Sequence, residues 1–199
     1  MSRGSPVGLW ALALALLAFV SACSSYDVLV TKDQVCQQRW ADVEAQLQRR
    51  ADLVPNLVEV VRGSAKHEEQ TLEQVTQARA AATAITLKPE DFEDPDKMAA
   101  FAKAQEDLRG ALARLLVVQE VYPDLKANAA FHDLQIQIEG TENRILRARE
   151  EYDAAVADYN AELGHVRGAV INRVTGRPFK PRAYFAASPG ATAAPKVSF

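Results

Sequence analysis

The chain has 199 residues with a formal charge of -3, and 48% of them are hydrophobic but only 7% are aromatic. This length allows one domain with a sizeable core, and the composition, with just nine glycines, favours helices over sheets. All 26 acidic residues lie between Asp27 and Glu162, whereas the chain from Val166 onward carries six basic residues and no acid. An acidic body argues against a nucleic-acid binder, so the basic end is the candidate surface for anions.

The N-terminus has the layout of a secretory signal. Arg3 is followed by an apolar run over residues 7–20 and by small residues before Cys23. A run of about 14 to 16 residues spans roughly 21 to 24 Å as a helix, which is less than the roughly 30 Å hydrocarbon core of a bilayer. Residues 20–23 also resemble the bacterial lipobox, which predicts a lipoprotein signal peptide over residues 1–22 and an acylated Cys23. An ordinary signal peptide or an uncleaved anchor is the alternative interpretation.

The two cysteines have different expected roles. Ser24 after Cys23 resembles the pattern of lipoproteins sorted to the outer membrane, in a host that has one. We therefore expect a membrane-anchored lipoprotein of the bacterial cell envelope that faces the periplasm. Cys36 is then left without a partner for an internal disulfide, and its helical phase places it on a packed face. A catalytic thiol at Cys36 would need an activating His or cation nearby, so the packing role is favoured.

The first half of the chain predicts two helices and a loop. A helix over about residues 26–62 has apolar side chains at alternating three- and four-residue steps, and Pro55 should kink it. Gly63-Ser64 favours a turn before a second helix over about 65–87, while the continuing apolar phase leaves one bent helix open. Residues 88–96 contain two prolines and five acids, which predicts a solvated loop.

The second half supplies two further helices. The third is predicted from about Met98 to Val121, capped by Asp94 or Asp96 and stopped at residues 122–124. The fourth, about 126–165, has an apolar or aromatic residue at every seventh position from 131 to 166 and would be roughly 60 Å long. The predicted fold class is all-α: an elongated antiparallel up-and-down four-helix bundle with a long C-terminal helix. The Ala, Pro and Ser content of residues 186–199 predicts a disordered tail.

The residues show no catalytic or metal-binding pattern. His67-Glu68-Glu69 starts like a zincin helix, but Thr71 stands where the second histidine is required. The chain also lacks a Gly-rich phosphate loop and a Gly-x-Ser-x-Gly elbow. We expect no enzymatic activity, no cofactor and no metal; an enzyme would need a site assembled from scattered residues.

Arg50 is the one charged residue on the packed stripe of the first helix. A buried guanidinium needs a carboxylate or several carbonyls. Counting 12 residues from the end of the first helix and 12 into an antiparallel fourth helix places Arg50 opposite Ile138, one turn from Glu142. We predict an Arg50–Glu142 pair, joined by Asn143, that fixes the register of the two helices. Arg50 at the rim without a defined partner is the alternative.

The basic segment over residues 167–185 follows the fourth helix. In an up-and-down bundle this helix ends on the side where the first helix begins, which is the anchored side. Arg173, Arg177, Lys180 and Arg182 are therefore predicted to contact the membrane surface, each contributing on the order of 1 kcal/mol near an anionic leaflet. An ordinary solvated tail is the alternative.

The chain resembles the LemA family. The resemblance runs from Tyr26 to Phe185 and is most specific at Leu-Val-Pro-Asn-Leu-Val (53–58) and Tyr-Pro-Asp-Leu-Lys (122–126). It implies a four-helix bundle domain, here over residues 23–185, tethered by its N-terminus to a bacterial membrane and without established enzymatic activity. Asp27 and Asp153 replace the usual Asn, His165-Val166 replaces an aromatic-Pro pair, and the lipobox departs from the family's usual transmembrane anchor.

The signal, the bundle and the missing catalytic pattern together predict a function. We expect a non-enzymatic, lipid-anchored cell-envelope protein that acts as a binding or scaffolding module of the LemA type. Its expected partners are membrane lipid through acylated Cys23, an unidentified envelope protein and a second copy in a homo-oligomer, but no nucleic acid. An accessory subunit or regulator of an envelope enzyme, such as a membrane protease, is the alternative.

Overall fold

A computed structural model of the chain describes residues 6–65, 68–165 and 179–185, with side chains from residue 26 onward. These residues form helices and no strand: α1 Pro6–Ser64, α2 Glu69–Ala84, α3 Pro95–Val117, α4 Pro123–Lys126 and α5 Ala129–Gly164, with 3-10 turns η1 Pro89–Glu93 and η2 Val118–Glu120. The predicted all-α class is confirmed.

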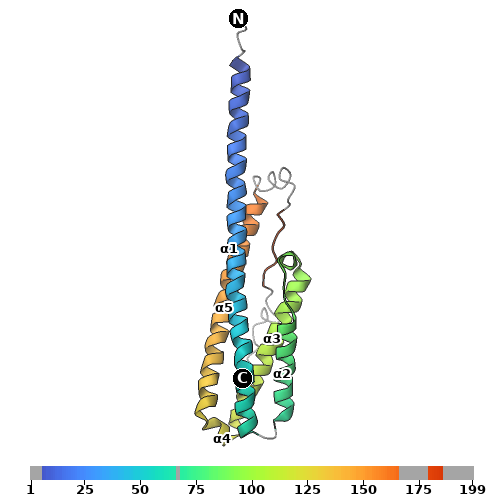
Figure 1. Ribbon diagram of the computed structural model, residues 1–199, viewed down its shortest axis with the longest axis vertical. Coiled ribbons are helices and arrows are strands. Elements are labelled where there is room, and N and C mark those ends of the chain that lie inside the picture. The colour runs from blue at the N-terminus through green and yellow to red at the C-terminus, as the bar shows by residue number, and fades with distance from the viewer. Residues whose placement is uncertain (1–5, 66–67, 166–178, 186–199) are drawn as a thin grey trace, which may run out of the picture.

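The four long helices run up and down along one axis. α1 and α5 form a long antiparallel pair, and α2 and α3 form a shorter hairpin beside it (Figure 1). α4 turns the chain at the distal end of the bundle, which is the end opposite to the N-terminus (Figure 1). The predicted helical bundle is therefore confirmed. Its longest element is α1, with 59 residues against 36 in α5.

The helix boundaries in the first half of the chain differ in part from the prediction. α1 begins at Pro6 rather than near Tyr26, because the apolar run joins the amphipathic part without a break, and it continues through Pro55. It ends at Ser64, and α2 is a separate helix, so the alternative of one bent helix is wrong. The prediction of a solvated loop over residues 88–96 is wrong in part, because η1 buries Asp91 and Phe92.

Capping residues set the starts of α3 and α5. The side chain of Asp94 accepts hydrogen bonds from the backbone N–H groups of Asp96 and Lys97, so Asp94 is the cap of α3. Asn128 caps α5 in the same way, because its Oδ1 accepts from the backbone N–H groups of Ala130 at 3.0 Å and Phe131 at 3.3 Å. α3 ends at Val117, four residues before the predicted end, because η2 tightens the chain there.

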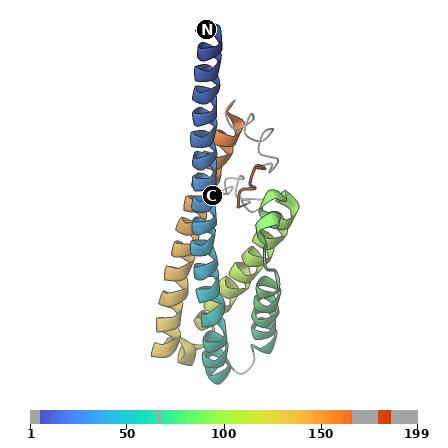
Figure 2. The ribbon, with the colours of Figure 1, turned by 45° about the horizontal axis from the view of Figure 1, so that its top comes forward.

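Two apolar clusters form the core. One lies around Trp40, whose ring centroid is 4.9 Å from that of Phe92 and 5.2 Å from that of Tyr152. The other fills the distal half and includes Leu57, Leu112, Leu115, Leu125 and Phe131. Towards the first cluster the α2–α3 hairpin leans away from α1, and residues 179–185 lie in the space between them (Figure 2). We call residues 179–185 the C-terminal strap.

Candidate functional site

A buried charge lies between the two apolar clusters. Arg50 of α1 is only 2% exposed. Its Nη1 donates to Oε1 of Glu142 in α5 at 2.9 Å, and its Nη2 donates to Gln105 of α3, at 2.6 Å to Oε1 and 3.1 Å to the backbone oxygen. We call Arg50, Gln105 and Glu142 the polar layer. The structure thus brings Arg50 and Glu142 into contact, and the effect of this pair on helix register remains a prediction.

Gln105 is the member of the polar layer that the sequence analysis missed. Its Nε2 also donates to the backbone oxygen of Ala82 in α2 at 3.0 Å, so the layer reaches all four long helices. Asn143, predicted to join the pair, instead lies exposed on α5. The signal was available, because Gln105 occupies the stripe position between Phe101 and Leu108 where an apolar residue is expected.

Two ion pairs show the register of the antiparallel helices α1 and α5. Lys32 lies 3.8 Å from Asp158, and Arg39 lies 2.7 Å from Glu151. The step of seven residues from Lys32 to Arg39 equals the step from Glu151 to Asp158, as an antiparallel pair requires. Arg50 lies 11 residues after Arg39 whereas Glu142 lies 9 residues before Glu151, so the ion pair of the polar layer is shifted by two residues from this register.

Pro55 connects α2 to the same part of α1. Proline has no N–H, so the carbonyl of Ala51, four residues earlier, receives no helical hydrogen bond from it. Nε of Arg79 in α2 donates to this carbonyl at 2.8 Å. The position that was expected only to kink the helix therefore supplies an attachment point for α2.

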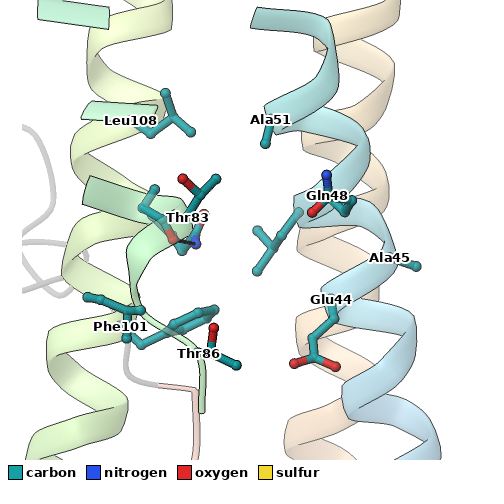
Figure 3. A pocket seen from close by; sticks show the side chains of 12 residues that line it. Glu44, Ala45, Gln48, Ala51, Thr83, Thr86, Phe101 and Leu108 are labelled. Carbon is teal, nitrogen blue, oxygen red and sulfur yellow. Dashed lines mark hydrogen bonds between the residues drawn. The ribbon is translucent and has the colours of Figure 1, made fainter. Parts of the chain in front are cut away.

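A groove lies beside the polar layer, between α1 and the α2–α3 hairpin (Figure 3). Its volume is about 380 Å³. Its floor is apolar and buried, and its rim is polar and exposed; the floor contains Leu47, Ala51, Ala82, Phe101 and Leu108, and the rim contains Glu44, Gln48, Thr83 and Thr86. Glu44 is the one ionisable residue among those that line it. Such a lining suits apolar side chains of a partner and offers no acid–base pair.

Cys36 has the environment of a packing residue. It is fully buried, and this burial raises the pKa of its thiol to about 11. The thiol is therefore protonated at neutral pH, and the thiolate that a nucleophile requires is scarce. Among the described residues, no group of three or more His, Cys, Asp or Glu side chains could hold a metal ion.

The four basic residues predicted at the membrane surface fall into three classes. Arg173 and Arg177 lie outside the described residues. Lys180 is exposed and forms an ion pair with Glu93 at 2.7 Å. Arg182 is buried at 8% exposure, and its Nη2 lies 2.7 Å from Oδ1 of Asp33. The prediction of a surface contact is therefore wrong for Arg182, because a carboxylate inside the bundle neutralises its charge.

The N-terminal part of α1 extends past the end of its partner helix. Lys32 pairs with Asp158, and α5 ends six residues later at Gly164. The end of α5 therefore lies about level with Tyr26 of α1. Residues 6–25, which include Cys23, continue beyond as a single helix about 30 Å long (Figure 1). In the part of the chain that the structure describes, no helix contains a stretch long and apolar enough to cross a membrane.

Comparison with known proteins gives the family. The profile of the LemA family matches residues 39–199. Magnetosome protein MamQ 2 and magnetosome protein MamQ 1 of Paramagnetospirillum magneticum are each 25% identical to this chain over 193 residues, which cover 88% of this chain and 70% of the relative. Magnetosome protein MamQ of Magnetospirillum gryphiswaldense matches with the same identity and coverage. With most of its length matched by the profile, and with a helical bundle as its fold, this chain belongs to the LemA family.

Proposed function

We propose that this LemA-family chain is a non-enzymatic, lipid-anchored protein of the bacterial cell envelope that acts as a binding or scaffolding module. The observation that carries the proposal is the projecting part of α1, whose apolar sequence ends at Val20-Ser21-Ala22-Cys23. Cys23 precedes Leu29, the first buried residue among the side chains described from residue 26 onward, by six residues. Acyl chains on Cys23 would therefore hold the bundle within about 10 Å of a bilayer.

A binding role is supported over a catalytic one by the groove beside the polar layer. Its rim carries a carboxylate, an amide and two hydroxyl groups, without a neighbouring base that could activate a nucleophile. The curated relatives are named after a cellular structure, the magnetosome, and not after a reaction. A rigid bundle that presents a groove to a partner fits both observations.

The anchor also implies a location. A chain acylated at Cys23 faces the periplasm, and Ser24 favours the outer membrane in a host that has one. Arg173 and Arg177 follow α5 in the sequence, and α5 ends on the anchored side of the bundle. We include these two arginines as contacts with anionic headgroups, whose attraction is screened by salt.

Mass spectrometry of the N-terminal peptide tests the anchor. We expect residues 1–22 to be absent and Cys23 to carry acyl chains in protein purified from membranes. Cys23→Ser should abolish both changes and release the bundle from the membrane, whereas the matched control Cys36→Ser should leave them intact. A mature N-terminus at any other residue would contradict the proposal.

A pull-down of the anchored chain tests the binding role. Capture of the chain itself, or of a non-enzymatic envelope protein, supports the module, whereas one stoichiometric enzyme partner supports the alternative of an accessory subunit or regulator, for example of a membrane protease. Thr86→Trp, which fills the groove, should reduce capture. Ala80→Trp, on the exposed face of α2 outside the groove lining, serves as its control. Equal capture by both variants would exclude the groove as the binding surface.

A further inference from the structure

Side chains of α5 bind the backbone of the C-terminal strap. Asn160 binds both backbone groups of Arg182, because its Oδ1 accepts from the N–H at 2.9 Å and its Nδ2 donates to the carbonyl at 2.9 Å. Tyr159 donates from its hydroxyl to the carbonyl of Lys180 at 3.1 Å. These bonds fix an extended segment through backbone groups, which every residue except proline possesses in full.

The same arrangement repeats two turns earlier on α5. Tyr152 donates from its hydroxyl to the carbonyl of Ala183 at 3.2 Å, and Oδ1 of Asp153 accepts from the N–H of Phe185 at 2.7 Å. The N–H of Ala183 donates across the strap to the carbonyl of Phe92 in η1 at 2.7 Å. We call Tyr152, Asp153, Tyr159 and Asn160 the strap site. Their spacing of seven residues places both pairs on one face of the helix.

Arg182 is the first of two side-chain anchors in the strap. Its Nε and Nη2 lie 2.9 and 2.7 Å from Oδ1 of Asp33 in α1. Its guanidinium carbon lies 5.3 Å from the ring centroid of Phe92 and 5.9 Å from that of Tyr159. One carboxylate and two aromatic rings around the same side chain favour a guanidinium.

Phe185 is the second anchor. It is 4% exposed, and its ring centroid lies 6.2 Å from that of Trp40 and 6.1 Å from that of Phe101. The guanidinium of Arg149 lies over the ring at 4.0 Å. Tyr184, by contrast, is 50% exposed. The site therefore selects an extended peptide with arginine three residues before phenylalanine and tolerates variation at the residue before the phenylalanine.

Nothing in these contacts depends on the strap belonging to the same chain. The backbone bonds and both anchors are made by groups of α1, α3, α5 and η1, and a second copy carries the same Arg182 and Phe185. The 13 residues between His165 and the strap, 166–178, can span up to about 45 Å, against a width of roughly 20 to 24 Å for two packed helices. Exchange of an identical segment is a low-cost route to a dimer.

We propose that the strap site is a peptide-binding site that accepts residues 179–185 of a second copy of this chain, so that two copies exchange straps. The inference rests on the proposed function because it names a partner of the binding module. The contacts of the strap site do not involve Cys23 or its acyl chains. Strap exchange can therefore be tested on unacylated protein, and its failure would be distinguishable from failure of the proposed lipid anchor. Copies held on one membrane would meet at a high effective concentration, which favours exchange.

Fluorescence anisotropy with a labelled peptide of residues 177–187 tests the site. The full chain with Arg182→Ala and Phe185→Ala has a vacated site and should bind the peptide at least ten-fold more tightly than the wild type, whose own strap competes. Adding Asn160→Ala to the chain, or Arg182→Ala to the peptide, should weaken binding at least ten-fold. Tyr184→Ala in the peptide is the control and should leave binding unchanged.

Circular dichroism first establishes that the vacated variant is folded; if it is not, Phe185→Ala alone takes its place. Equal binding to chains with and without Asn160→Ala would overturn the site. Light scattering then tests exchange in an equimolar mixture of the strap-defective chain and a site-defective Asn160→Ala chain with an intact strap. The mixture should contain a heterodimer that neither chain forms alone. Monomers only, despite peptide binding, would overturn the second copy as the occupant.

Discussion

Removing one member of the polar layer should destabilise the bundle far more than breaking an exposed pair between the same two helices. Glu142→Gln keeps the shape of the side chain but leaves the guanidinium of Arg50 buried at 2% exposure without a carboxylate. Breaking a buried ion pair in this way typically costs about 3 to 5 kcal/mol. Because the side chain of Glu142 is itself 25% exposed, we expect a loss near the lower value, about 3 kcal/mol.

Arg50→Met should cost less than the full value of its three hydrogen bonds. The methionine retains an apolar stem, and Glu142 can turn towards water, so the main penalty is the unsatisfied oxygen of Gln105, about 1 to 3 kcal/mol. Once Arg50 is absent, Glu142→Gln should have little further effect. The double-mutant cycle should therefore give a coupling of about 2 to 3 kcal/mol.

Urea unfolding followed by circular dichroism measures each free energy of unfolding. Arg39→Met with Glu151→Gln is the matched cycle, because this pair also joins α1 to α5 but its side chains are 41% and 44% exposed. An exposed pair contributes about 0 to 1 kcal/mol. A coupling below about 0.5 kcal/mol at Arg50, or one equal to that of the control, would refute a buried polar layer that fixes the register.

Three further predictions follow from buried groups. Cys36, whose thiol pKa burial raises to about 11, should react with iodoacetamide at pH 8 at least about 100-fold more slowly in the folded chain than in urea, measured by mass spectrometry with the other cysteine changed to serine; equal rates would contradict the burial. Burial raises the pKa of Asp153, so the folded chain binds more protons than the unfolded chain above the ordinary carboxyl pKa, and the wild type loses stability as pH rises through that window. Asp153→Asn removes this titration, so the free energy of unfolding of the variant minus that of the wild type should increase as the pH rises from about 3.5 to 6 in urea melts. A decrease of this difference with pH would contradict the expected direction. Arg79→Met should destabilise the wild type by about 0.5 to 1.5 kcal/mol but the Pro55→Ala chain by less, because the new N–H can donate to the carbonyl of Ala51; equal losses in urea melts would separate Pro55 from α2 docking.

The sequence sufficed to predict the long helix pair and its polar contact. Two antiparallel helices have the same rise per residue, so counting from a shared end aligns distant residues, and this placed Arg50 within one turn of Glu142. Gln105 was not found by the same route, because its helix belongs to the hairpin, whose register against α1 depends on the length of a turn and not on periodicity. A polar residue on an apolar stripe was nevertheless a usable signal.

The C-terminal strap could not be predicted from local pattern. Its seven residues alternate between apolar and polar side chains, but the polar Arg182 is buried against this alternation, and its charges resemble those of a solvated tail. Its order comes from groups far away in the chain, since Arg182 meets Asp33 across 149 residues. Asn160 and Tyr152 lie on α5 at positions that a helical pattern explains without any ligand, so their hydrogen-bonding groups gave no independent signal.

Pro55 shows how a local rule can have a consequence in a distant part of the chain. The rule states that proline removes a helical hydrogen bond and so weakens the helix, and the bond to the carbonyl of Ala51 is indeed unavailable to it. Another donor reaches that carbonyl, because Nε of Arg79 in α2 donates to it. Gln105 binds the carbonyl of Ala82 in the same manner. Both alanines lie on the floor of the groove, so the hydrogen bonds to their carbonyls connect α1, α2 and α3 at this floor, as a preformed binding surface requires.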